Sequence, residues 1–151
     1  MRIVALDPGG TTGWASANSL ALEYYQWQRG QLTGEHHEEL WHLLQVHQPE
    51  VLVIERFQYQ RRDMERGVQL NIDAREYIGV AKLWAKIGAC SSVDLVLQTP
   101  HQRKVFDDEK LKKMSLYLPA MSHAMDATRH LLYYLVVTCG QRELLDVLRP
   151  S

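Results

Sequence analysis

The sequence predicts an α/β fold in which a mixed five-stranded sheet is flanked by helices. Three extended segments follow one another in residues 2–28 without a helical stretch between them, which favours antiparallel neighbours. Residues 35–48 then change to a helical period, and the continuous apolar run Val51–Ile54 that follows is typical of a strand covered on both faces. Because a helix precedes this run, we expect it to join the first strand in parallel through a right-handed crossover.

The first strand, Arg2–Leu6, ends in a carboxylate and a sharp turn. Asp7 follows the apolar run directly, and residues 8–10 (Pro-Gly-Gly) supply a fixed φ and then two residues that are free to adopt positive φ. Residues 11–14 resume an extended pattern, so a hairpin holds Asp7 at the end of a core strand. Such a carboxylate is costly unless it bonds to backbone N–H groups of the turn, is paired, or binds a metal ion, and this stretch alone leaves these alternatives open.

The next segments complete an antiparallel meander and then change to a helix. Trp14–Ala17 and Leu20–Gln28 predict two further strands, with residues 18–19 as turn material. Apolar side chains on one helical face predict a helix over Glu35–Gln48, which the following proline ends.

A second acidic residue follows the second buried strand. Glu55 comes directly after Val51–Ile54, just as Asp7 follows the first strand. The carboxyl ends of parallel strands meet at one edge of a sheet, where α/β folds gather their chemistry. We therefore expect Asp7 and Glu55 to lie side by side.

The C-terminal half begins with a loop and a long helix. Arg56–Gly67 is polar and has no sustained period, which predicts a mobile loop, and a helix is expected over Val68–Ile87. Gly79 within that helix costs about 1 kcal/mol relative to alanine, which indicates close approach by another backbone. A last strand is predicted over Asp94–Gln98.

Further helices complete the chain. One or two short helices that carry several basic residues are expected within His101–Met114, followed by a linker at residues 117–120. Ser122 is a candidate N-cap for a closing helix that extends to Cys139, and one more short helix is expected after Gly140.

Size and composition indicate one globular domain, residues 1–151. Hydrophobic residues make up 46% and charged residues 23% of the 151 residues, which is an ordinary globular balance. With 17 basic and 18 acidic residues, any binding of nucleic acid must use local patches. Two cysteines suit a reducing compartment, and neither a signal peptide nor a bilayer-long apolar run is visible. We expect a cytoplasmic protein without a membrane partner, in the host cytoplasm if its source is a virus.

Two polar residues at the start of the closing helix complete a candidate metal site. His123 and Asp126 are three residues apart, so both project from one face of the first helical turn. With Asp7 and Glu55 they would bring three carboxylates and an imidazole together. Two Mg²⁺ ions roughly 4 Å apart would relieve the repulsion and clamp the attacking water and the leaving oxygen of a phosphodiester. The imidazole favours tolerance of Mn²⁺ as well.

Each of these residues also has an ordinary structural explanation. Asp7 fits a turn and Glu55 fits a strand end in solvent. Asp126 fits the first turn of a helix, and His123 fits a polar position near a cap. Taken separately, these explanations do not account for the pattern as a whole. Each predicted strand or helix end that is expected near this point carries a residue of a type that binds metal ions.

Three motifs resemble a known family. They are ALDPGGTTGWA at residues 5–15, VLVIERF at residues 51–57 and SHAMDATRHLLYYL at residues 122–135. Together with the order of elements, they resemble the RuvC-type Holliday junction resolvases of the RNase H-like nuclease superfamily, especially its phage-type members. The resemblance covers nearly the whole chain and implies an RNase H-like fold. It also implies magnesium-dependent cleavage of branched DNA by a homodimer, with Asp7, Glu55, His123 and Asp126 as the metal-binding catalytic set.

The same resemblance implies contacts with DNA. In the family, a loop after the glutamate strand carries an aromatic residue that stacks at the junction centre, and Phe57 and Tyr59 are the candidates here. A basic residue before the final helix helps to hold the scissile phosphate, and Lys104 is favoured over Arg103 for this catalytic role. Further expected DNA contacts are Arg61, Arg62, Arg66, Arg103, Lys110, Lys112 and Lys113. The last three fit a solvated helix face equally well.

Other functions stay open on the sequence alone. The DPGGTT hairpin also resembles the phosphate-binding hairpin of actin-like sugar kinases and ATPases, but these need two such domains and 151 residues supply one. A non-catalytic domain that binds branched DNA in recombination is a second alternative. An RNA–DNA hybrid hydrolase or a flap- and fork-cutting nuclease is a third, because the metal centre does not itself choose the substrate.

Overall fold

The computed structural model describes residues 1–21, 24–57 and 72–147, which are built around one five-stranded sheet. Its strands are β1 (Arg2–Asp7), β2 (Thr11–Ala21), β3 (Tyr24–Thr33), β4 (Val51–Glu55) and β5 (Asp94–Gln98). Their order is β3-β2-β1-β4-β5, with antiparallel pairing from β3 to β1 and parallel pairing from β1 to β5. The mixed sheet predicted from the sequence is therefore confirmed.

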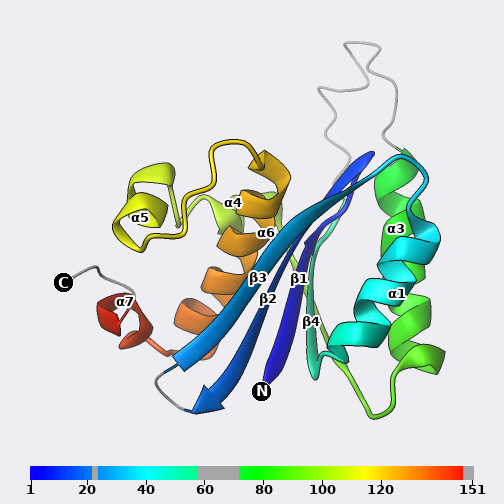
Figure 1. The fold of residues 1–151 in the computed structure, drawn as a ribbon, viewed down its shortest axis with the longest axis horizontal. Coiled ribbons are helices and arrows are strands. Elements are labelled where there is room, and N and C mark those ends of the chain that lie inside the picture. The colour runs from blue at the N-terminus through cyan, green and yellow to red at the C-terminus, as the bar shows by residue number, and fades with distance from the viewer. Residues whose placement is uncertain (22–23, 58–71, 148–151) are drawn as a thin grey trace.

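Helices cover both faces of this sheet. They are α1 (His37–His47), α3 (Ile72–Leu83), α4 (Pro100–Arg103), α5 (Asp108–Lys113), α6 (Ser122–Leu132) and α7 (Leu144–Val147). Figure 1 shows α1 and α3 on one side of the sheet and α6 on the other, together with α4, α5 and α7. Turns of π-helix extend α3 over Trp84–Gly88 and α6 over Tyr133–Thr138. No helix among the described residues has the length and apolarity to cross a bilayer.

Strand β1 shows how one apolar run serves both layers. Ile3 and Ala5 belong to the core beneath α6, whereas Val4 and Leu6 belong to the core beneath α1 and α3. All four are at most 1% exposed, as expected for alternate side chains of a strand that is covered on both faces. The same alternation in β4 explains why its sequence is continuously apolar.

The hairpin between β2 and β3 differs from the sequence prediction. The predicted turn at residues 18–19 is wrong, because β2 continues to Ala21 and pairs Asn18 with Gln26 of β3. The pairing shifts register between Ser19 and Ala21. An Asn-Ser pair has the local chemistry of a turn, but the long pairing of two strands overrides this preference.

A close backbone approach occurs at Gly13 and not at Gly79. A Cβ atom on Gly13 would lie 1.9 Å from the carbonyl oxygen of His123, so the missing side chain lets β2 touch the first turn of α6. A Cβ atom on Gly79 would meet nothing within 4 Å among the described residues, so no backbone of the same chain makes the predicted close approach there.

The start of α6 is capped from the sheet. Ser122 is the first residue of the helix, and Met121 occupies the N-cap position without a capping hydrogen bond from its side chain, so the predicted Ser122 cap is wrong. Instead, Oε1 of Gln31 accepts hydrogen bonds from the backbone N–H groups of His123 at 2.9 Å and Ala124 at 3.3 Å. Free N–H groups at a helix start need such an acceptor, and β3 provides it.

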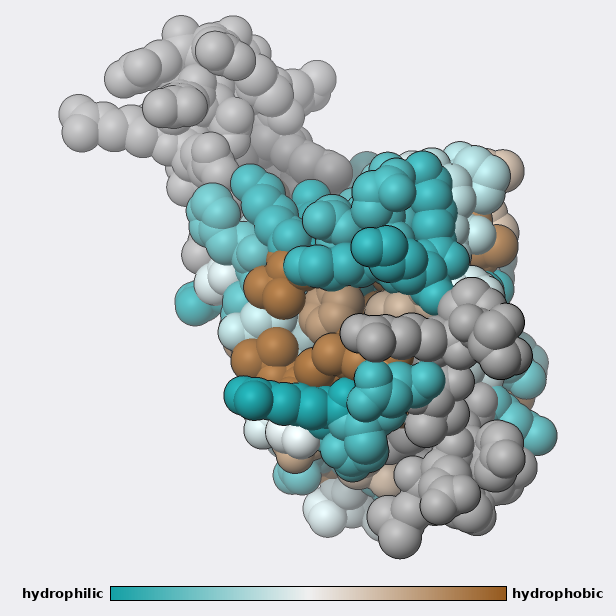
Figure 2. Space-filling model, turned by 90° about the vertical axis from the view of Figure 1, so that its left-hand side faces the viewer, coloured by the Kyte–Doolittle hydropathy of each residue, from teal (hydrophilic) through white to brown (hydrophobic). Residues whose placement is uncertain are grey.

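An apolar groove is exposed beside α5 and α7. Figure 2 shows hydrophobic residues gathered between hydrophilic ones on this side of the molecule. The groove has a volume of about 340 Å³. It is lined by Val105, Phe106, Met114, Val136, Val137 and Leu145, with Lys110 and Lys113 as its basic residues.

Candidate active site

Two strand ends bring Asp7 and Glu55 side by side. Strands β1 and β4 pair in parallel with Leu6 opposite Ile54, and the next residue of each strand is acidic. The side chains of Asp7 and Glu55 are only 10% and 15% exposed. The structure therefore has the two neighbouring carboxylates that the strand pattern predicts.

The first turn of α6 brings His123 and Asp126 to the same edge. Gly13 and Gln31 are cross-strand partners on β2 and β3, and together they hold this turn against the sheet. The Nδ1 atom of His123 lies 3.0 Å from Oδ2 of Asp7, which links the helix to the end of β1.

Arg103, the last residue of α4, lies among the three carboxylates. Its guanidinium forms a hydrogen-bonded ion pair with Glu55. The same group lies 4.0 Å from Oδ1 of Asp7 and 3.7 Å from Oδ2 of Asp126. One positive charge is thus within reach of carboxylates from two strands and one helix.

Of the two adjacent basic residues, Arg103 and not Lys104 lies among the carboxylates. Lys104 is exposed, and no ion pair joins it to the three carboxylates within the described ranges. Successive helical residues point about 100° apart, so one of two adjacent basic side chains faces the site more directly than the other. Which one does so depends on where α4 sits, and the sequence does not contain that information.

Burial and charge separate the acidities of Asp7 and Glu55. Burial and the nearby charge of Glu55 raise the pKa of Asp7 to about 6, despite the hydrogen bond to His123. Burial also acts to raise the pKa of Glu55, but hydrogen bonds from His130 and Arg103 outweigh it and leave that pKa below its ordinary value. Asp7 is therefore the carboxylate whose negative charge is less well compensated.

Two buried residues that the sequence analysis missed support Glu55 from within the protein. His130 on α6 is 0% exposed, and its Nε2 atom donates a hydrogen bond to Oε2 of Glu55 at 2.6 Å. Its Nδ1 atom lies 2.6 Å from Oε1 of Gln98 at the end of β5. The available signal was a histidine on the apolar side of α6, because a buried polar side chain needs a partner.

Arg129 holds the carboxylate of Asp126. Its guanidinium forms hydrogen-bonded ion pairs with Asp126 and with Asp108, and its Nε–H donates to the carbonyl of Phe106 at 2.9 Å. The Arg129 side chain is only 13% exposed. Asp126 therefore lies between two guanidinium groups, those of Arg103 and Arg129, and its orientation is well defined.

The predicted DNA contacts lie partly within the described residues. Those outside them are Tyr59, Arg61, Arg62 and Arg66. Phe57 lines a cavity between α3 and β5. On α5, Lys112 pairs with Glu109 at 2.9 Å, whereas Lys110 and Lys113 line the apolar groove of Figure 2. A role in DNA binding stays a prediction for all of these residues.

The donor set has the chemistry of a divalent-cation site. As the side chains stand, the described residues contain no three His, Cys, Asp or Glu side chains that surround one point closely enough to bind an ion. The three carboxylates nevertheless converge on one cation, the Arg103 guanidinium, and they offer the oxygen ligands that Mg²⁺ prefers. The raised pKa of Asp7 indicates that Arg103 compensates their charge incompletely. In residue type and in convergence, these side chains fit Mg²⁺.

The sheet order and its helical layers define an RNase H-like fold. Within that fold, the chain is similar to RuvC from Thermus thermophilus, with a TM-score of 0.68 and 16% identity over 93% of this chain and 97% of that chain. T. thermophilus RuvC in complex with a Holliday junction substrate gives a TM-score of 0.65, with the same identity and coverage. Fowlpox virus resolvase in complex with Holliday junction DNA gives a TM-score of 0.60 and 13% identity, over 89% of this chain and 97% of that chain.

These likenesses confirm the fold that the sequence motifs imply. No protein-family model and no curated protein sequence matches the chain.

Proposed function

We propose that residues 1–151 form a single nuclease domain, a metal-dependent endodeoxyribonuclease that cuts phosphodiester bonds in Holliday junctions and related branched DNA. The observation that carries this proposal is the convergence of Asp7, Glu55 and Asp126 on one positive charge. Two proteins of this fold, T. thermophilus RuvC and Fowlpox virus resolvase, form complexes with Holliday junctions, which favours branched DNA as the substrate.

The proposed metal ligands are Asp7, Glu55, His123 and Asp126. Two Mg²⁺ or Mn²⁺ ions bound by them would supply the Lewis acidity for in-line hydrolysis of a DNA phosphodiester, which leaves a 5′-phosphate. Asp7 is the proposed shared ligand, because it lies between Glu55 and His123, while Glu55 and Asp126 would each hold one ion.

Other residues of the chain would orient these ligands and the substrate. His130 fixes the carboxylate of Glu55, and Arg129 fixes that of Asp126. Arg103 carries several N–H donors in a planar fork, a geometry that matches phosphate oxygens as well as carboxylates. We therefore propose that Arg103 donates hydrogen bonds to the scissile phosphate when DNA is bound.

A homodimer belongs to this proposal. Resolution of a four-way junction requires one cut in each of two strands, and the described part of each chain offers one acidic site, so a twofold dimer provides the pair. Sedimentation equilibrium is expected to report a dimer. A monomer at high micromolar concentration would contradict this part of the proposal.

The direct test incubates the purified chain with a four-way junction, a fork, a flap, an RNA–DNA hybrid and linear duplex DNA. Each substrate receives Mg²⁺, Mn²⁺ or a chelator. We expect cutting of the junction with either metal, none with the chelator, and an intact linear duplex. Junction binding without cutting would instead identify a non-catalytic recombination factor. Preferential cutting of the hybrid or the flap would assign a different substrate to the same site.

A further inference from the structure

A cavity lined with basic residues opens between α3 and β5. Its volume is about 380 Å³, and Arg56, Arg75 and Lys82 contribute its three positive charges. All three residues are exposed. In the part of the chain that the structure describes, none of them forms an ion pair with a carboxylate. Three cations around one opening, without an ion-pair partner among the described residues, favour an anionic ligand.

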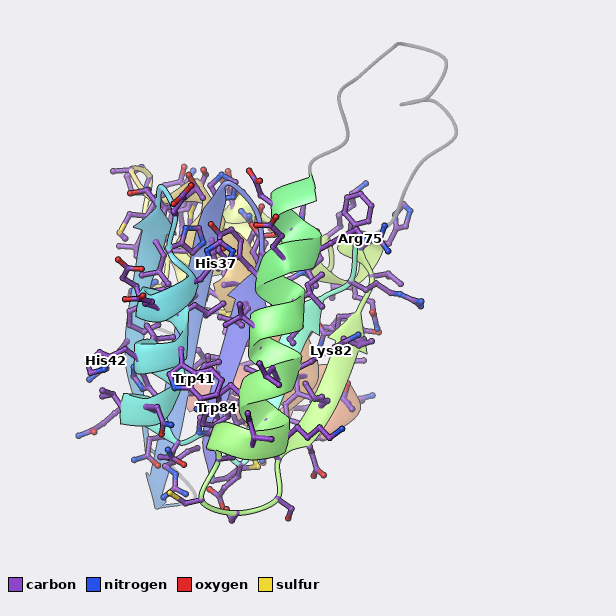
Figure 3. The ribbon with its side chains drawn as sticks, turned by 90° about the vertical axis from the view of Figure 1, so that its right-hand side faces the viewer. His37, Trp41, His42, Arg75, Lys82 and Trp84 are labelled. Carbon is purple, nitrogen blue, oxygen red and sulfur yellow. The ribbon has the colours of Figure 1, made fainter. Side chains whose placement is uncertain are left out.

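Helix α3 separates its charges between two sides. Arg75 and Lys82 are two helical turns apart, so they share a face, and Figure 3 shows both on the side of α3 that lies next to the yellow-green strand β5. Glu76 points the other way, with its Oε2 atom 3.0 Å from Nε2 of His37 on α1. Asp73 faces the turn after β1. The carboxylates of α3 therefore do not neutralise the cavity.

Gly79 lies between the two basic residues of α3 and also lines the cavity. A Cβ atom there would meet nothing within 4 Å, and Gly79 is not among the residues with positive φ, so neither packing among the described residues nor backbone conformation requires a glycine. A glycine inside a helix is about 1 kcal/mol less favourable than an alanine. The missing side chain leaves open space beside the helix, within the lining of the cavity.

The remaining lining of the cavity is apolar. Phe57, Ile78 and Leu97 contribute it, and Leu97 is 44% exposed although it belongs to a strand. An aromatic ring and aliphatic side chains beside several cations match an unstacked nucleotide, whose base packs on apolar surface and whose phosphates pair with arginine and lysine. A phosphate ion alone would leave the apolar lining unused.

We propose that this cavity binds an unstacked nucleotide of the DNA substrate together with its neighbouring phosphates. The inference rests on the nuclease function proposed above and adds Arg56, Arg75 and Lys82 to the DNA contacts. Arg56 follows Glu55 directly, and its backbone N–H donates to the carbonyl of Gln98 at 2.8 Å, which fixes one wall of the cavity beside the acidic site. A strand that is cut at the acidic site therefore has only a short distance to extend before it reaches the cavity.

The first test is the salt dependence of binding to a four-way junction in the presence of chelator. The double variant Arg75→Ala/Lys82→Ala is expected to bind on the order of tenfold more weakly near 0.1 M salt. The slope of log K against log salt concentration should become shallower by about 2, one for each lost phosphate contact. Lys86→Ala/Arg142→Ala is the matched control, because it removes the same charge from exposed positions that do not line the cavity. A double variant with wild-type affinity and slope would overturn the proposal.

A second variant fills the cavity without changing the charge. Gly79→Leu is expected to weaken junction binding while the thermal midpoint of unfolding stays equal or rises, since leucine is the better helix former. Unchanged binding by Gly79→Leu would contradict the proposal. So would conversion of a dimer into a monomer with an unchanged salt slope, because the cavity would then be an interface between copies.

The two proposals fail in different ways. If the wild-type chain binds junctions without cutting them, the nuclease function is contradicted. The cavity is then still tested by comparing the salt slopes of binding between the wild type and the double variant. If the double variant cuts junctions normally and its binding has the wild-type salt slope, only the proposal that the cavity binds DNA is contradicted.

Discussion

Charged side chains are compensated differently in the two regions that flank Glu55, the acidic site next to α6 and the cavity next to α3. Toward α6, three carboxylates lie within reach of Arg103, and buried or half-buried side chains of α6 hold two of them in place. Toward α3, the cations around the cavity have no carboxylate partner among the described residues. Charges that are compensated within the chain can be kept buried and oriented, as chemistry requires, whereas uncompensated surface charges are available to a ligand. The contrast separates a candidate catalytic centre from a candidate binding surface.

The largest expected effect compares glycines on the two sides. Gly13→Ala is expected to lower the free energy of unfolding by about 3 kcal/mol, because its Cβ would lie 1.9 Å from the carbonyl oxygen of His123 and push α6 away from the sheet. Gly79→Ala is the matched control, since the same methyl group meets nothing within 4 Å. Urea unfolding of both variants measures the difference. Equal effects would contradict a close approach at Gly13.

The second prediction concerns the incompletely compensated carboxylate. Folding raises the pKa of Asp7 from 3.8 to about 6, so the folded chain binds more protons than the unfolded chain in that pH window. The contribution of Asp7 to stability is therefore present at low pH and is lost as the pH rises from about 4 to 6. Asp7→Asn removes this loss and is expected to raise stability at pH 8, in chelator, by about 2 to 3 kcal/mol.

Chemical denaturation across pH tests this second prediction. The stability of the wild type relative to Asp7→Asn should fall as the pH rises from about 4 to about 7 and then level off. A variant that is less stable than the wild type at pH 8 would show that the charge of Asp7 is well compensated without a metal ion, and the site would then have no electrostatic need for one.

The smallest expected effect concerns His130. His130→Ala is expected to slow junction cutting by about 10- to 100-fold, because it removes the hydrogen bond that orients Glu55, while junction binding in chelator changes little. His130→Gln should recover part of the rate, since its amide can donate to the same carboxylate. Single-turnover rates separate the two variants. A merely structural role would give His130→Gln no advantage in rate over His130→Ala at equal stability.

The fold followed from sequence patterns because each strand carries its own signal. The apolar runs that end in Asp7 and Glu55 predict buried parallel strands, and their register then brings the two acids together. The turn at residues 18–19 was the exception, since its local chemistry competes with pairing across the whole hairpin. Local preference is a weak guide wherever a long strand partner is available.

The supporting residues of the site carried weaker signals. Gln31 and Gln98 belong to no recognisable sequence motif. Each contributes to the site only because its strand lies beside α6, where Gln31 contacts His123 and Gln98 contacts His130. His130 has the position of a core residue on α6, and the choice between Arg103 and Lys104 depends on the rotation of a single helical turn. Such roles are set by the packing of one element on another, which the local sequence does not encode.

The most direct test of a catalytic metal site is junction nicking by Asp7→Asn in Mg²⁺, compared with the wild type at equal binding. Removing a proposed metal ligand should cost at least as much as removing the residues behind the ligands, which is typically about 10- to 100-fold. We expect the wild type to nick the junction and Asp7→Asn to lose nicking by about 100-fold or more while it still binds the junction. Nicking by Asp7→Asn at the wild-type rate would contradict a catalytic metal site at the ends of β1, β4 and α6.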